Sequence, residues 1–279
     1  MAILQLHKVS KSYRSGTFFK RTKPVPILCS VSLAIGTGEC VGLVGRSGSG
    51  KSTLGRIALG IENADQGEIY LLGQKIGSGP KSMSKHLRRT VQVVFQDGYS
   101  SCNPRWTAGK IIGEPLGNFE RLTGAETRMR VFELLQQVGL TENDAEKYPS
   151  HFSGGQLQRV CIARALAARP KLIILDEAVS SLDMIVQARI LDLLEQLRQT
   201  TGMAFLFITH DLRLIRKFCS RAFVLHKGSL EPFPVQLDTR LPPAVQELAD
   251  ALLPATPGAS SNVKNDIIAL SPTFDHLAN

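Results

Sequence analysis

The stretch CVGLVGRSGSGKSTLGRIALG, residues 40–60, decides the fold. Its first five residues are apolar or small and predict a short buried strand. A loop rich in glycine and serine follows, and residues 51–59 have the pattern of a helix that Gly60 ends. A loop between a buried strand and a helix is expected at the carboxyl edge of a parallel sheet, where such sheets bind ligands.

The loop itself, GRSGSGKST, matches the pattern G-x-x-x-x-G-K-[ST]. Its glycines let backbone N–H groups surround phosphate oxygens, Lys51 adds positive charge at the β- and γ-phosphates, and Ser52 offers a hydroxyl to Mg²⁺. A glycine-rich turn that binds nothing is the alternative, and the flanking strand and helix argue against it. The predicted nucleotide-binding residues are Gly45, Arg46, Ser47, Gly48, Ser49, Gly50, Lys51, Ser52 and Thr53.

A second motif, LIILDE at residues 172–177, is an aliphatic strand that ends in two acids. In a parallel sheet these acids lie at the same edge as the phosphate loop. Asp176 is expected to hold Mg²⁺ through water, and Glu177 to act as the general base toward an attacking water. The alternative is a strand followed by a solvated acidic turn. The phosphate loop elsewhere in the chain favours the catalytic interpretation.

A third motif, SGGQ at residues 153–156, lies directly before a helical pattern. Glycines and a serine at a helix N-terminus form an anion cradle, since the helix dipole favours negative charge there. Ser153 acting as a simple helix cap is the alternative, and it is favoured when the motif is taken alone. The chain thus offers two candidate phosphate-binding surfaces.

Strands and helices alternate through most of the chain. This alternation predicts an α/β fold with a mostly parallel sheet covered by helices on both faces. The stretch between Gln96 and Ser153 has helical periodicity and is expected to be a helical insertion. Predicted strands cover residues 3–13, 27–35, 40–44, 91–95, 172–175, 204–209 and 222–225; predicted helices cover 155–168, 186–199 and 212–219; residues 14–26 are expected to form a hairpin loop.

Composition narrows the function classes. The 279 residues are 43% hydrophobic and 20% charged, as in an ordinary globular protein, and the five cysteines lack metal-ligand spacing. The longest apolar run is too short for a membrane span and no signal peptide is expected, so we predict a cytoplasmic chain. The net charge of +9 is compatible with phosphates, nucleic acid or an anionic membrane, while 6% aromatic residues give base stacking little support.

The ordered motifs GRSGSGKST, Gln96 after a strand, FSGGQ, LIILDE, SSLD and His210 after a strand together resemble the nucleotide-binding subunits of ABC transporters over residues 1–230. This resemblance implies a P-loop NTPase core with an N-terminal antiparallel β portion and a helical subdomain at about 97–165. It also implies roles for individual residues: Tyr13 stacks on adenine, Gln96 contacts Mg²⁺ and reports to the membrane partner, Asp183 lies at the dimer seam, His210 contacts the γ-phosphate as a catalytic residue, and Ser153, Gly154, Gly155 and Gln156 grip the ATP of the opposite subunit.

Within this family, VFQD at residues 94–97, NPR at 103–105 and LFITHDLRLI at 206–215 resemble the ATPases of dipeptide, oligopeptide and nickel importers, and DEAVS points to nickel. The implied function is ATP hydrolysis, with Mg²⁺, coupled to uptake of nickel or of a nickel-chelate or peptide-type substrate. The implied partners are transmembrane permease subunits, a second ATP-binding subunit that is homologous or identical and, indirectly, an extracytoplasmic substrate-binding protein, with no nucleic acid. The implied location is peripheral, on the cytoplasmic face of the inner membrane.

Two other function classes stay open. A soluble ABC ATPase acting on nucleic acid or ribosomes would suit the positive charge. By resemblance, however, such proteins usually carry two cassettes in one chain or a long coiled-coil insertion. A regulatory module without turnover is disfavoured by the presence of both Glu177 and His210. Residues 231–279, which have two basic and six acidic residues, are expected to form a C-terminal extension with one short amphipathic helix and a loose tail.

Overall fold

The computed structural model describes residues 2–14, 23–77 and 83–235. Part of the expected hairpin loop (15–22) and the expected C-terminal helix and tail (236–279) lie outside these residues. The elements are β1 Ala2–Tyr13, β2 Val25–Gly36, β3 Cys40–Val44, α1 Lys51–Ala58, β4 Gln66–Leu71, β5 Gln74–Ile76, α2 Lys85–Thr90, β6 Val91–Phe95, α3 Ala108–Phe119, α4 Gly124–Gln137, the 3₁₀ turns η1 Glu142–Glu146 and η2 Pro149–His151, α5 Gly154–Ala167, β7 Leu172–Asp176, α6 Met184–Thr201, β8 Ala204–Ile208, α7 Leu212–Phe218, β9 Arg221–His226 and β10 Ser229–Phe233.

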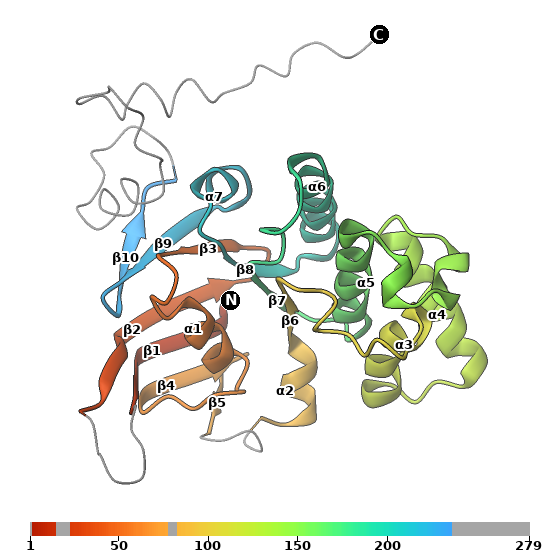
Figure 1. Ribbon diagram of the computed structural model, residues 1–279. Helices are drawn as coiled ribbons and strands as arrows, with labels where there is room; N and C mark the ends of the chain where they lie inside the picture. Colours follow the sequence, from red (N-terminus) through yellow and green to blue (C-terminus); the bar gives the residue numbers. More distant parts are fainter. Residues whose placement is uncertain (1, 15–22, 78–82, 236–279) are drawn as a thin grey trace, which may run out of the picture.

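A six-stranded sheet forms the centre of the molecule, with the strand order β10-β9-β3-β8-β7-β6 (Figure 1). The strands from β9 to β6 are parallel to their neighbours, and β10 pairs antiparallel to β9. Residues 204–208 of β8 are all buried, as expected for a central strand covered on both faces. The predicted α/β fold with a mostly parallel sheet is confirmed.

Successive residues of the sheet face two different cores. Phe205 and Phe207 of β8 pack with apolar residues of α5, α6 and α7, whereas Leu206 and Ile208 pack with α1 and strands β1 and β2. Figure 1 shows α6 and α7 on one side of the sheet and α1 with the smaller sheet on the other. The prediction of helices on both faces was therefore wrong in part, because an antiparallel sheet buries most of the second face.

This second sheet has the order β2-β1-β4-β5 and is antiparallel throughout. The turn between β4 and β5 places Leu72 and Gly73 at φ angles of 52° and 75°, the left-handed pair that tight hairpins need. The implied N-terminal antiparallel portion is confirmed. Its apolar face packs against the main sheet and α1, the helix that follows the phosphate loop.

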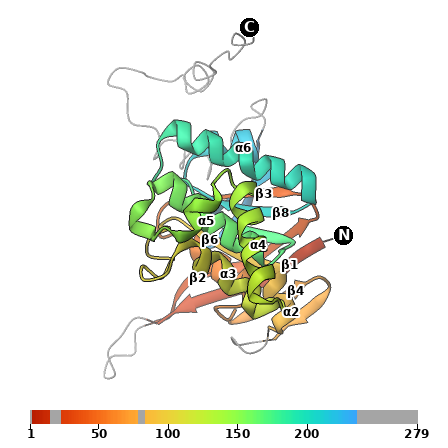
Figure 2. The ribbon, with the colours of Figure 1, turned by 90° about the vertical axis from the view of Figure 1, so that its right-hand side faces the viewer.

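Helices α3, α4 and α5 form a separate group beside the sheet. Figures 1 and 2 show the three helices together, next to α6 and away from the antiparallel sheet. Ile111, Leu134 and Val160, one from each helix, are fully or almost fully buried in one core cluster. Thr123 and Glu126 form a reciprocal capping box at the start of α4. The helical insertion is thus where the sequence predicted it. None of the described helices is long and apolar enough to cross a membrane.

Strands β4, β5 and β10, helix α2 and the two 3₁₀ turns are absent from the elements expected from the sequence, and α2 and β10 show why. Helix α2 has six residues, too few for a clear apolar period, and it is started by Ser84, whose side chain accepts from the backbone of Leu87. Strand β10 crosses the expected boundary between residues 230 and 231 and pairs with β9 as far as Phe233. Because β10 lies at the sheet edge, its alternation of apolar and polar residues is weak.

Candidate nucleotide site

The ends of four parallel strands bring the predicted site residues to one edge of the sheet. Phe95 at the end of β6 pairs with Asp176 at the end of β7, and Asp176 pairs with Ile208 at the end of β8. Gln96, which is exposed, and Glu177 therefore follow neighbouring strands directly. Strand β3, on the other side of β8, leads into the phosphate loop. This is the carboxyl edge at which the sequence placed the site.

The phosphate loop closes around the side chain of Lys51. Gly48 and Gly50 have φ angles of 78° and 106°, and a side chain at Gly50 would meet Ile27 at 2.7 Å. Only glycine fits both requirements at position 50. The ammonium group of Lys51 donates to the carbonyl oxygens of Gly45 (2.8 Å) and Arg46 (3.1 Å). Burial lowers the pKa of Lys51, although the nearby Glu177 and Asp176 carboxylates act in the opposite direction.

Ser52 and Asp176 form an oxygen pair beside Lys51. The Ser52 hydroxyl donates to Oδ1 of Asp176 at 3.3 Å. Burial raises the pKa of Asp176, and the hydrogen bond from Ser52 only partly offsets this effect. The Asp176 carboxylate is half-buried, and its ionised form is disfavoured. Together with the neighbouring Ser52 hydroxyl oxygen it forms a pair of oxygen ligands that suits a hard cation such as Mg²⁺.

Glu177 and His210 face each other across the ends of β7 and β8. Nδ1 of His210 lies 3.2 Å from Oε2 of Glu177, and the Glu177 backbone N–H donates to the carbonyl of Ile208 at 2.9 Å. Glu177 has a φ angle of 51°, a left-handed conformation that is costly for a residue with a side chain. Both side chains remain partly exposed, so a water molecule and a ligand can reach them.

Tyr13 at the end of β1 lies over the first turn of α1. Its hydroxyl is 3.4 Å from Oγ1 of Thr53 and donates to Glu62, while the ammonium of Lys11 is 5.6 Å from the ring centre. Tyr13 is 39% exposed, which leaves room for a ligand to stack on it. Sequence reasoning missed Glu62, because a lone acid in a turn carries no motif. The contact with Tyr13 identifies it as a residue that orients the ring.

The SGGQ residues do not join this cluster. In Figure 1, α1 and α5 lie on opposite sides of β6 and β7. Ser153 accepts from the backbone N–H of Gln156 (3.3 Å) and Gln156 accepts from that of Ser153 (3.0 Å), so Ser153 does cap α5. A side chain at Gly155 would meet Val186 at 2.3 Å, which places α5 directly against α6. Asp183 caps α6 there through the N–H groups of Ile185 and Val186.

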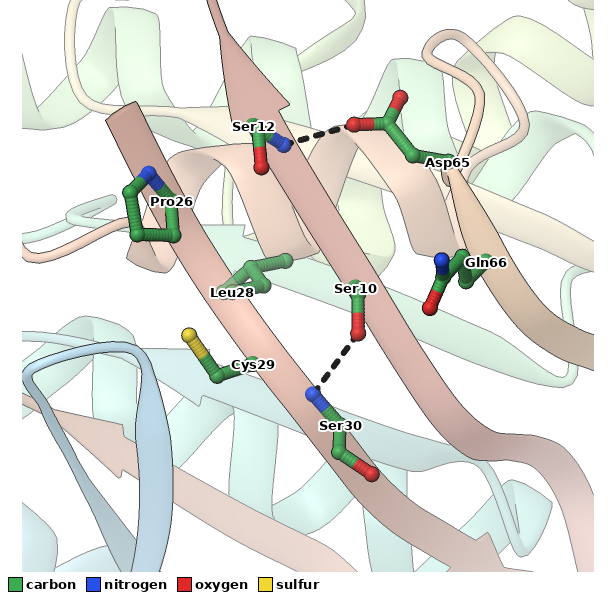
Figure 3. A pocket seen from close by; sticks show the side chains of 8 residues that line it. All are labelled: Ser10, Ser12, Pro26, Leu28, Cys29, Ser30, Asp65 and Gln66. Atoms are coloured by element: carbon green, nitrogen blue, oxygen red, sulfur yellow. Dashed lines mark hydrogen bonds between the residues drawn. The ribbon is translucent and has the colours of Figure 1, made fainter. Parts of the chain in front are cut away.

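A hollow of about 360 Å³ lies elsewhere, on the antiparallel sheet (Figure 3). Ser10, Cys29, Ser30 and Asp65 are among its lining residues, and the Ser30 backbone N–H donates to the Ser10 hydroxyl at 2.9 Å. Its described lining includes none of the residues that the motifs singled out. The candidate nucleotide site is instead the open strand edge around Lys51, Asp176 and Glu177.

Comparison with known proteins agrees with this geometry. Residues 28–180 match the family model described as ABC transporter. The nickel import ATP-binding protein NikE of Rhodospirillum rubrum is 48% identical over 261 residues, which cover 93% of this chain and 94% of the relative. NikE of Escherichia coli K12 is 43% identical over 259 residues, 92% of this chain and 97% of the relative.

Solved structures give the same result. The ATP-binding cassette MJ0796, in a dimeric post-hydrolysis state bound to ADP and phosphate, superposes with a TM-score of 0.74 at 31% identity over 84% of this chain and 99% of that one. CbiO1 of Clostridium perfringens, part of the ABC transporter complex cbiONQ, superposes with a TM-score of 0.72 at 29% identity, over 82% of this chain and 87% of that one. The expected ABC-type P-loop fold is confirmed. The chain therefore belongs to the ABC transporter family, and it is the kind of subunit that hydrolyses ATP in such a transporter.

Proposed function

We propose that this chain is the ATPase of a nickel importer and couples ATP hydrolysis at the candidate nucleotide site to uptake. The observation that carries the ATPase role is the convergence of Lys51, Asp176, Glu177 and His210 at one strand edge. Nickel is supported by the NikE relatives, each matched over nine-tenths of its length. The proposed cassette covers residues 1–230 together with the rest of β10, and about 97–165 is its helical subdomain.

ATP binds with its phosphates in the loop 45–53. Lys51 exchanges its two carbonyl partners for phosphate oxygens, and the backbone N–H groups at the start of α1 face the same charge. Tyr13 stacks on the adenine ring, held at its angle by Glu62. Ser52 and Asp176, together with Gln96 at the end of the neighbouring strand β6, are the residues that would hold Mg²⁺, which would supply charge neutralisation at the phosphates.

Glu177 is the general base of the hydrolysis step. Its carboxylate accepts a proton from the attacking water, which then forms the new bond to the γ-phosphorus while the bond to the β-phosphate oxygen breaks. His210, 3.2 Å from this carboxylate, can turn its imidazole toward the γ-phosphate once ATP is bound. The strained backbone of Glu177 holds the carboxylate at the sheet edge rather than along the strand.

A second ATP-binding subunit completes each site. Helices α1 and α5 lie on opposite sides of β6 and β7, so the N-terminus of α5, with Ser153, Gly154, Gly155 and Gln156, lies apart from the phosphate loop of its own chain. Its anion cradle meets the γ-phosphate bound by a partner subunit, with Asp183 at the seam. Closure around ATP supplies the motion, since ATP binds the closed state more tightly. Transmembrane permease subunits receive this motion at the cytoplasmic face, and a substrate-binding protein delivers nickel from outside.

Uptake by the assembled transporter tests the proposal. The complex, purified from membranes and reconstituted into liposomes with its binding protein, is expected to take up radioactive nickel only with ATP and Mg²⁺ on the cassette side. The Glu177→Gln complex should show background uptake. Uptake of a labelled dipeptide without nickel uptake would overturn the substrate, and loss of ATP dependence would overturn the coupling.

A further inference from the structure

Two buried thiols lie together where the loop after Gln96 rests on helix α5. Sγ of Cys102 and Sγ of Cys161 are 3.6 Å apart, and the two residues are 6% and 1% exposed. A disulfide needs a sulfur separation of about 2.05 Å, so each sulfur has to move by about 0.8 Å, within the reach of small side-chain rotations. Both cysteines are free thiols in the structure.

The surroundings make Cys102 the reactive member of the pair. The hydrogen bond from the Cys161 thiol and the charge of Arg164, whose Nη1 is 4.0 Å from the Cys102 sulfur, lower the pKa of Cys102 to about 6. The same hydrogen bond, together with burial, raises the pKa of Cys161. One thiolate beside one protonated thiol is the arrangement in which an oxidised first sulfur is captured by the second.

A second pair in the same chain provides an internal comparison. Cys40 and Cys219 are also buried, and their sulfurs are also 3.6 Å apart. Burial and the hydrogen bond to Cys219 raise the pKa of Cys40 well above its usual value. The sulfur–sulfur distance is the same in both pairs, and the guanidinium of Arg164, 4.0 Å from the Cys102 sulfur, distinguishes the first pair.

We propose that Cys102 and Cys161 form a reversible disulfide site through which peroxides slow ATP hydrolysis. The Cys102 thiolate attacks one oxygen of hydrogen peroxide, the O–O bond breaks, and a sulfenic acid and a hydroxide ion result. The hydroxide takes up one proton, equivalent to the proton that the Cys102 thiol released when it ionised, and becomes the first water. The Cys161 sulfur then attacks the sulfenic sulfur, loses its proton and releases a second water as the S–S bond forms. Two thiols and one peroxide thus give one disulfide and two waters, and a dithiol reductant reverses the change.

The bond would lock the loop that carries Gln96. Helix α5 already holds this loop through breakable contacts: Gln158 donates to the Phe95 carbonyl at 3.2 Å and Arg164 to that of Ser101 at 2.5 Å. A covalent bond in their midst removes the freedom of the loop to shift with nucleotide state. This effect rests on the proposed role of Gln96, because a loop that does not move in the ATP cycle loses nothing when it is fixed.

Peptide mapping of the full chain after peroxide treatment tests the site. Free thiols are alkylated and the protein is digested without reductant. The expected product is a disulfide between the peptides of Cys102 and Cys161, in the wild type and in the control Cys40→Ser. Cys161→Ser should instead accumulate a sulfenic acid at Cys102, trapped by dimedone, and Cys102→Ser should not react. No linked peptide, or a Cys40–Cys219 disulfide in place of this one, would overturn the proposal.

ATP hydrolysis on the same samples tests the consequence. Oxidised wild type is expected to hydrolyse ATP at least about fivefold more slowly than reduced wild type, with recovery by dithiothreitol, whereas Cys102→Ser keeps its rate under peroxide. An unchanged rate in protein that carries the mapped disulfide overturns the regulation. If the reduced chain hydrolyses no ATP at all, the ATPase role fails, and the peptide map still decides the disulfide.

Discussion

Among single residues, Lys51 gives the clearest test of the nucleotide site. Its side chain is almost fully buried. Its ammonium donates its hydrogen bonds to two carbonyls of the loop, so Lys51→Ala is expected to keep the fold. ATP binding should weaken and turnover should fall by at least about 100-fold, since a charge that meets the phosphates is lost. Nucleotide titration and a phosphate-release assay measure both effects. Lys75→Ala, on exposed strand β5, is the control that should hydrolyse ATP normally.

Asp176 predicts a conflict between stability and function. Because its pKa is raised in the folded state, the ionised carboxylate destabilises the nucleotide-free protein at neutral pH. Asp176→Asn should therefore raise the free energy of unfolding at pH 7 while it weakens the response to Mg²⁺. The gain should vanish as the pH falls below 3.8, where the carboxyl group is protonated in both states. Urea unfolding of both proteins at several pH values checks the sign, and a variant that is less stable at pH 7 would contradict it.

Glu177→Gln keeps the size and hydrogen bonding of the side chain and removes the proton acceptor. ATP should bind with near wild-type affinity while hydrolysis falls by at least about 100-fold. Single-turnover measurements separate the two steps. Rapid turnover by this variant would place the base elsewhere.

The motif residues of the phosphate loop and the strand ends were predictable because each chemical role requires a residue type at fixed spacing. Lys51 and Asp176 lie near enough for the carboxylate to act on the pKa of the lysine, and Asp176 accepts a hydrogen bond from Ser52. Glu62, which binds Tyr13, could not be predicted, because its role comes from a contact across 49 positions and not from a local pattern. The cysteine pairs were missed for the same reason: 59 positions separate Cys102 from Cys161.

At the scale of elements, helix α5 carries the most specific prediction. Ser153 caps α5 and also begins the proposed second anion cradle. Ser153→Arg places a long cation in the proposed seam, so it should spare the binding of one nucleotide to the isolated chain and block ATP-dependent closure. Size-exclusion chromatography with and without ATP measures closure.

Two controls separate the seam from the cap in this experiment. Loss of the cap alone costs about 1 kcal/mol, and Ser153→Ala reports that cost in thermal unfolding. Ser153→Thr keeps a hydroxyl and should still close. If Ser153→Arg abolished nucleotide binding to the isolated chain, the two cradles would belong to one intramolecular site, and the two-subunit mechanism would be wrong.

Buried strands and long amphipathic helices were predicted closely, because burial on both faces gives β7 and β8 unbroken apolar runs. The short helix α2 and the edge strand β10 were not, since local periodicity is weak in both. The covering of the second face of the main sheet was predicted only in part. Strands β1 and β2 cover this face because the chain returns across it. Their position is a property of the tertiary fold.

In the whole molecule, the sheet edge that carries the candidate nucleotide site is connected to a separate group of helices. Helices α3, α4 and α5 lie beside the sheet, and the loop after Gln96 connects them to its edge. Residues such as Tyr99 on that loop and Met129 on α4 are large, apolar and exposed. Such exposed apolar side chains are candidate contacts for the proposed permease partner.

The most direct test of this account is ATP hydrolysis by the assembly that carries the chain in the cell, recovered through an affinity tag. We expect the tagged chain to be extracted from membranes together with integral membrane subunits, and the complex to hydrolyse ATP. Glu177→Gln should abolish hydrolysis without loss of the partners. Added DNA or RNA should leave the rate of hydrolysis unchanged. Recovery of the chain on ribosomes or nucleic acid, with hydrolysis stimulated by RNA or DNA and no membrane subunit present, would contradict it.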